Sequence, residues 1–124
     1  MKIAIMESLA VPAQKLAELK KPFEEAGHTF AEYERTTDVP TLIRQAQDAD
    51  VMVIANMPMP AEVIRACDNL KFIDVAFTGV DHVGLDAAKE KGVAVSNASG
   101  YSNEAVAELV LGMALSLSRK IGRA

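Results

Sequence analysis

The segment TGVDHVG, residues 78–84, has the composition of a loop that binds an anion through its backbone. It follows an apolar run and precedes a short helix-forming stretch, so the amides of Thr78, Gly79 and Val80 are expected to point towards one spot. Gly79 permits a positive φ and lets a ligand approach the backbone closely. A carboxylate suits such a nest of N–H groups, although a strand-to-helix turn without a ligand explains the spacing equally well.

Two polar side chains lie where they could assist such binding. Asn56 directly follows the apolar run 50–55, and Tyr101 precedes the last helix-forming segment. Each also has a plainer interpretation, a tight turn for Asn56 and packing at the sheet edge for Tyr101. His82 lies in the same loop as the anion-binding amides, where a loop-capping or exposed role is favoured over a contact with ligand.

Several kinds of catalytic centre find no support in the sequence. No two of the seven glycines are spaced as Gly-x-Gly, so there is no dinucleotide-binding fingerprint. Neither His28 nor His82 has further ligands at metal-binding spacing, so no metal site is predicted. There is no Gly-x-Ser-x-Gly nucleophile elbow. Glu7 alone does not supply the acidic cluster of a receiver-type signalling domain.

Alternating segments must position these residues. Short apolar runs predict strands at 2–6, 28–33, 50–55, 71–77 and 93–97. Segments with helical spacing follow at 12–27, 39–49, 60–68, 85–92 and 102–120. Five successive β-α units predict an α/β fold, a five-stranded doubly wound parallel sheet of flavodoxin-like (βα)5 order. Ligands of such sheets bind outside the carboxyl ends of the strands, where the loops with Asn56, Thr78 and Tyr101 would meet.

The composition indicates one acidic globular domain. The 124 residues are 50% hydrophobic and 24% charged, with a net charge of -4 and a pI of about 5.1. This balance argues against nucleic acid or an anionic membrane as partner. The single cysteine, Cys67, excludes an internal disulfide and fits a cytoplasmic location, and it is expected to pack in or near the core. No signal peptide is visible.

The last predicted helix, 102–120, is apolar on nearly every face. Ser102 is a candidate N-cap. Polar or small residues form only one stripe, at Glu104, Glu108, Gly112, Ser116 and Lys120. Such helices are normally buried, and burying each Leu, Val or Met stabilises a protein by about 1.5–3 kcal/mol. We therefore expect this helix to fold back on its own sheet or to be buried in a homodimer, with exchange between subunits as one form.

Residues 70–121 resemble the N-terminal part of the D-isomer-specific 2-hydroxyacid dehydrogenases. That family includes D-lactate, glycerate, phosphoglycerate and formate dehydrogenases. The motifs that carry the resemblance are TGVDHV, AAKEKGVAVSN and AVAELVLGMAL. The first 69 residues agree in layout, with ANMPMPAEVI similar to the loop and helix after the family's third strand. Gly84 departs from the family, in which many members carry Asp at this place.

The resemblance implies that residues 1–124 form a single flavodoxin-like substrate-binding domain, truncated before the NAD-binding domain. The helix 102–120 would cross to that domain. The full enzyme would transfer hydride between NAD or NADP and a 2-oxo acid. The catalytic Arg, Glu and His and the dinucleotide fingerprint would belong to the missing part, so the chain alone is expected to be inactive and to bind no cofactor.

The resemblance also implies roles for individual residues. Thr78 and Gly79 match the pair whose backbone amides hold the substrate carboxylate. Tyr101 matches a tyrosine that some lactate-type members place against the substrate, and Asn56 lies in a loop that shapes substrate choice. Val106 lies near the expected place of the nicotinamide. A small 2-oxo or 2-hydroxy acid would bind weakly to this chain.

The alternative is a stand-alone flavodoxin-like binding or scaffold module without catalysis. In that case the helix 102–120 must pack on its own sheet. A receiver-like signalling domain is the least supported interpretation, because its acidic residues are lacking.

Overall fold

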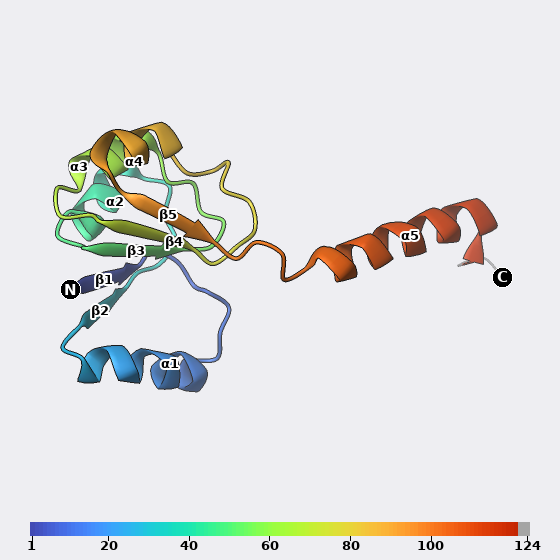
Figure 1. Ribbon diagram of the computed structural model, residues 1–124, viewed down its shortest axis with the longest axis horizontal. Coiled ribbons are helices and arrows are strands. Elements are labelled where there is room, and N and C mark those ends of the chain that lie inside the picture. Colours follow the sequence, from blue (N-terminus) through green and yellow to red (C-terminus); the bar gives the residue numbers. More distant parts are fainter. Residues whose placement is uncertain (122–124) are drawn as a thin grey trace.

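The computed structural model describes residues 1–121 and shows strands and helices in strict alternation. One parallel sheet, of order β2-β1-β3-β4-β5, contains β1 (Lys2–Ile5), β2 (Thr29–Glu32), β3 (Val51–Ile54), β4 (Phe72–Val75) and β5 (Ala94–Asn97). The helices are α1 (Ala13–Glu25), α2 (Val39–Ala46), α3 (Ala61–Ala66), α4 (Leu85–Lys91) and α5 (Asn103–Arg119). All strand arrows in Figure 1 point to the side from which α5 leaves. The predicted α/β fold and its flavodoxin-like strand order are confirmed.

Local signals in the sequence set the helix ends. Asp38 precedes α2, and its carboxylate accepts a hydrogen bond from the Thr41 amide at 3.0 Å. Helix α4 ends at Gly92, whose φ of 70° lies in the left-handed region that favours glycine. Ser102 precedes α5 as predicted, but its side chain accepts no capping hydrogen bond. Helix α5 therefore begins without side-chain support.

The main core lies on the face of the sheet that α2, α3 and α4 cover (Figure 1). The strand register places Ala4, Met52 and Ile73 side by side, and each is 0% exposed. Cys67 at the end of α3 is also fully buried, as predicted. Burial raises the pKa of its thiol to about 11, because the apolar surroundings disfavour the thiolate.

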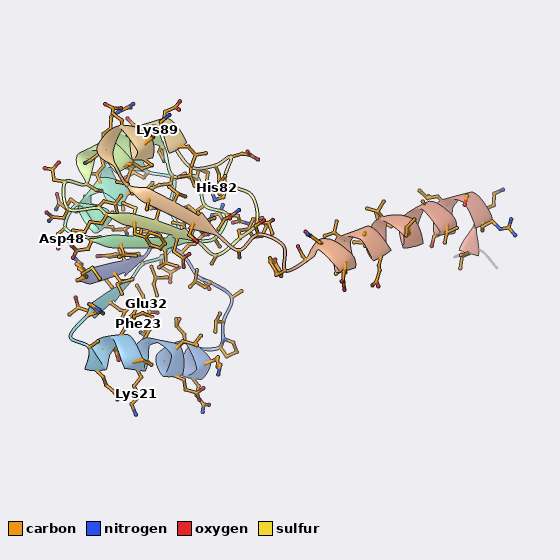
Figure 2. The ribbon with its side chains drawn as sticks, in the orientation of Figure 1. Lys21, Phe23, Glu32, Asp48, His82 and Lys89 are labelled. Atoms are coloured by element: carbon orange, nitrogen blue, oxygen red, sulfur yellow. The ribbon has the colours of Figure 1, made fainter. Side chains whose placement is uncertain are left out.

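The opposite face of the sheet is covered only in part, by α1. Figure 2 shows Phe23 on the side of α1 that faces the sheet, with Lys21 on the other side. A groove of about 410 Å³ lies between α1 and the sheet and extends over the half-exposed side chains of Val53, Phe72 and Asp74. Burial raises the pKa of the Asp74 carboxyl, because its surroundings disfavour the charged form.

Helix α5 projects away from the domain (Figures 1 and 2). None of its residues is buried, and Leu109, Leu111 and Leu117 are 62%, 64% and 82% exposed. The expectation that this helix folds back on its own sheet is therefore wrong for residues 1–121. A sheet covers only one side of a helix, so folding back would still leave the other apolar sides of α5 in water.

Gly84 lies where the loop after β4 meets the start of α3. A Cβ atom at Gly84 would lie 2.7 Å from both the N and the Cα of Ala61. The Gly84 amide also donates a hydrogen bond to the Met59 carbonyl at 2.9 Å, which keeps the two loops in contact. No side chain fits here without moving the backbone.

We therefore expect Gly84→Ala to lower the free energy of unfolding by about 1–3 kcal/mol, because the added methyl must push the loop from α3. Urea denaturation followed by circular dichroism measures this change. Gly79→Ala is the matched control, because a Cβ there meets nothing within 4 Å and φ lies outside the left-handed region. Equal stability of the two variants would contradict the close approach at Gly84.

Candidate functional site

The loops at the carboxyl ends of the strands are joined around the buried carboxylate of Glu7, which is 3% exposed. Its Oε1 accepts hydrogen bonds from the amides of Ala55 at 2.8 Å and Met57 at 2.7 Å. Its Oε2 accepts one from Arg35 Nη1 at 3.0 Å. Two amides and a guanidinium satisfy this buried charge. The loop after β3 is thereby fixed to the loops after β1 and β2.

Asn56 and His82 add to the same connection. Arg35 Nη1 also donates to Asn56 Oδ1 at 2.6 Å, so the Nδ2 group of Asn56 is left to donate elsewhere. His82 Nε2 lies 3.0 Å from the Ala55 carbonyl, which it contacts as a donor. His82 thus caps the loop after β3, which confirms the loop-capping role favoured from the sequence.

The loop after β4 presents unpaired backbone donors. The amides of Thr78, Gly79 and Val80 donate to no acceptor within residues 1–121. The Thr78 carbonyl accepts a hydrogen bond from Asn97 Nδ2 at 2.6 Å, which anchors the loop from its carbonyl side. The loop is therefore held in place while its amides stay available to an anion.

Gly79 does not use the positive φ that a glycine permits, because its φ lies outside the left-handed region. A Cβ at this position would meet nothing within 4 Å. The glycine therefore contributes open space in front of the backbone rather than an unusual backbone angle.

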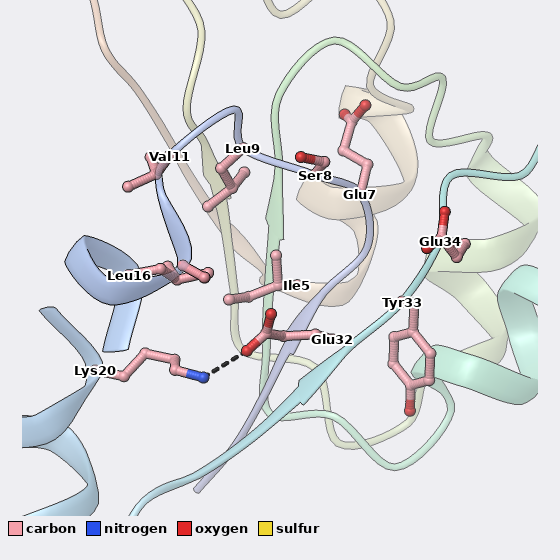
Figure 3. A pocket seen from close by; sticks show the side chains of 11 residues that line it. Ile5, Glu7, Ser8, Leu9, Val11, Leu16, Lys20, Glu32, Tyr33 and Glu34 are labelled. Atoms are coloured by element: carbon pink, nitrogen blue, oxygen red, sulfur yellow. Dashed lines mark hydrogen bonds and ion pairs between the residues drawn. The ribbon is translucent and has the colours of Figure 1, made fainter. Parts of the chain in front are cut away.

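A cavity of about 400 Å³ opens beside this loop, lined by side chains from the loops after β1, β2, β3 and β4. Its members include Glu7, Ser8, Arg35, Asn56 and Phe77, the last directly preceding Thr78 in the chain. A second cavity, of about 360 Å³, shares Glu7 and Ser8 and continues towards α1 (Figure 3). The ion pair between Lys20 and Glu32 lies in that second cavity.

The predicted site residues fall into two groups. Asn56 lines the 400 Å³ cavity. Thr78 and Gly79 directly follow Phe77, which also lines it. Tyr101 is 73% exposed in the segment that leads to α5, and Val106 on α5 is 54% exposed. Residues 1–121 by themselves do not bring Tyr101 and Val106 to the other three.

Sequence reasoning missed Glu7 and Arg35. In the sequence, Glu7 stands out only as a lone acid after the first strand, and Arg35 lies in a polar loop. One signal was present, because an acid directly after an apolar strand and a base directly after the next strand reach the same sheet edge. Their opposite charges could have been paired on that ground.

Other kinds of site are not built by the part of the chain that the structure describes. No three His, Cys, Asp or Glu side chains of residues 1–121 gather as a metal-binding group. No helix within the same residues is long and apolar enough to cross a membrane. Val106 lies on an exposed helix and lines none of the three cavities described for residues 1–121.

Comparison with known proteins decides the family. The family described as "D-isomer specific 2-hydroxyacid dehydrogenase, catalytic domain" matches residues 3–119. The chain belongs to this family. It is 36% identical over 121 residues to a Haemophilus influenzae protein assigned to the 2-hydroxyacid dehydrogenases, covering 98% of this chain and 37% of that protein. It is also 36% identical over 94 residues to the glycerate dehydrogenase of Methylorubrum extorquens, covering 76% and 30%.

Solved structures agree with this membership. The NAD-dependent formate dehydrogenase from Staphylococcus aureus, in complex with NAD, matches with a TM-score of 0.77 and 32% identity, over 99% of this chain and 40% of that chain. The apo-structure of D-lactate dehydrogenase from Escherichia coli matches with a TM-score of 0.65 and 28% identity, over 100% and 39%. The resemblance to D-2-hydroxyacid dehydrogenases is confirmed, and the chain spans roughly a third of the length of the curated relatives it matches.

We expect Glu7→Ala to lower the free energy of unfolding by about 2–5 kcal/mol, because it leaves two largely buried amides without an acceptor. Glu7→Gln keeps one oxygen for these amides but turns an NH₂ group towards Arg35, so a smaller loss of about 1–3 kcal/mol is expected. Urea denaturation measures both. Glu34→Ala is the control, because Glu34 is exposed and makes no hydrogen bond within residues 1–121. If Glu7→Ala proves as stable as Glu34→Ala, Glu7 does not hold these loops together.

Proposed function

We propose that this chain is the substrate-binding part of an NAD- or NADP-dependent D-2-hydroxyacid dehydrogenase. The whole enzyme would transfer hydride between the nicotinamide and a 2-oxo acid. The observation that carries the proposal is the set of three unpaired amides at Thr78, Gly79 and Val80, in a chain of this family. Relatives named hydroxypyruvate reductase and glycerate dehydrogenase act on compounds with a carboxylate, the group that such amides suit.

Each residue has a definite part in the proposed binding. The amides of Thr78 and Gly79 donate charge-assisted hydrogen bonds to the substrate carboxylate. Asn56 donates from Nδ2 at the neighbouring loop. Tyr101 would contact the substrate and Val106 the nicotinamide only when a further part of the enzyme, beyond residues 1–121, packs beside α5.

We do not expect the chain to catalyse the reaction by itself. The family resemblance implies that the acid/base His and the catalytic Arg belong to the cofactor-binding part of the enzyme; Arg35 and His82 do not match them, because both are engaged in holding the loop after β3. A stand-alone binding or scaffold module would need α5 to pack on its own sheet, and the exposure of α5 argues against it. A cytoplasmic location remains a prediction that rests on the single cysteine, Cys67.

Glyoxylate tests the carboxylate site directly. In ¹⁵N-labelled protein, we expect it to shift the amide signals of Thr78, Gly79 and Val80 with saturation and a Kd of about 1 mM or weaker, as suits one anion contact. Oxamide, which lacks the carboxylate, should leave them unchanged. Gly79→Ala should weaken the effect, because its methyl occupies the open space, whereas Gly112→Ala on α5 should not. The proposed site would be refuted if the signals of these three amides did not shift up to the highest glyoxylate concentration, or if only signals elsewhere in the protein shifted.

A homodimer through 102–120 also remains a prediction. Exposed apolar side chains of α5 and the open groove beside α1 both lack a partner in the described chain. We expect light scattering to show masses rising with concentration from 13.3 kDa towards twice that value. Leu109→Glu should shift the protein to monomer, whereas Ser116→Glu, on the polar stripe, should not. A monomer at every concentration would contradict the prediction.

A further inference from the structure

Arg35 has hydrogen-bonding capacity that the loop connection does not use. The Nη1 atom of Arg35 donates both hydrogen bonds that this side chain makes, one to Glu7 and one to Asn56. Its Nε and Nη2 atoms, with three N–H groups between them, have no partner within residues 1–121. The side chain is 50% exposed and lines the 400 Å³ cavity. The bonds at Nη1 fix the plane of the guanidinium, so the free N–H groups are held in place before any ligand arrives.

Two other donors share this cavity. Asn56 presents Nδ2, since its Oδ1 is occupied by Arg35. The Ser8 hydroxyl oxygen lies 3.3 Å from the Ala10 amide and accepts from it, so its own proton is free to donate. Leu9 and Phe77 supply apolar walls. The cavity therefore offers several fixed donors beside the loop that carries the free amides.

The charge balance limits what these donors suit. Among residues 1–121, the only charged side chains that line the cavity are Glu7 and Arg35, and they are paired with each other. A second anion would meet a guanidinium that is already neutralised and a carboxylate of its own sign. A neutral oxygen substituent accepts the same hydrogen bonds without that repulsion.

We propose that Arg35 and Asn56 select a substrate with an uncharged hydroxyl group on C3, next to the 2-oxo or 2-hydroxy carbon. This proposal rests on the proposed function, because the carboxylate must occupy the amides of residues 78–80 for C3 to reach the cavity. Arg35 and Asn56 donate to the C3 oxygen, and the apolar walls contact the carbon chain. The pairing of Glu7 with Arg35 disfavours a phosphate at the same position.

Three probes that share one carboxylate test the proposal on ¹⁵N-labelled chain 1–124: D-glycerate, D-lactate and 3-phospho-D-glycerate. We expect D-glycerate to bind roughly three- to tenfold more tightly than D-lactate, the gain of one or two added hydrogen bonds. The Arg35 Nε–H and Asn56 Nδ2 signals should shift with D-glycerate and stay in place with D-lactate. 3-Phospho-D-glycerate should bind no more tightly than D-glycerate.

Variants assign the preference to these side chains. Asn56→Ala leaves the bond between Glu7 and Arg35 intact and should reduce the preference for D-glycerate. Arg35→Met should abolish the preference, so that D-glycerate and D-lactate bind with equal affinity; the ratio of the two affinities measures this even if the variant changes both. Arg44→Met is the matched control, because Arg44 bonds only to Thr41 in its own helix.

The outcomes separate this proposal from the proposed function. If none of the three acids shifts the amides of residues 78–80, the proposed function fails. If all three shift them but D-glycerate and D-lactate bind equally, only the selection by Arg35 and Asn56 is overturned. A preference that survives in both Asn56→Ala and Arg35→Met, or tighter binding of 3-phospho-D-glycerate than of D-glycerate, overturns it as well.

Discussion

Glu7 is buried in the protein because two neighbouring loops, those after β2 and β3, supply its carboxylate with hydrogen-bond donors. A buried carboxylate without partners would cost several kcal/mol, so the amides of Ala55 and Met57 and the guanidinium of Arg35 are constrained to converge on it. This constraint fixes the loop after β3 and, through Arg35, the side chain of Asn56. The electrostatic requirement of one side chain thus shapes the edge where parallel sheets bind their ligands.

The loop after β4 joins this edge through separate contacts. Met59 and Val83 form a short parallel bridge, and His82 caps the carbonyl of Ala55. Gly84, at the end of the same loop, packs closely against Ala61 at the start of α3. Because these contacts use carbonyl groups and other amides, the donors of residues 78–80 remain free. These contacts hold the loop in place and leave its three amides unpaired within residues 1–121, as the proposed carboxylate site requires.

Helix α5 has the opposite character. The sequence predicts that its apolar side chains are buried, but no part of residues 1–121 covers them. The sheet face beside α1 is likewise open. The curated relatives are about two and a half times as long as this chain, which accords with the proposal that a further part of the enzyme packs beside α5. Tyr101 and Val106 lie in or next to this helix, so their surroundings depend on the same cover.

The sequence by itself determined the strands, the helices and their order, because apolar runs and helical spacing are local patterns and a parallel sheet of five β-α units leaves few topologies. The loop 78–84 and the family also followed from local motifs. Only the tertiary structure decided that Glu7 pairs with Arg35, a residue 28 positions away in the sequence. It also decided that α5 projects away from the domain. Which side chain satisfies a buried charge, and what covers an apolar helix, depend on elements distant in sequence.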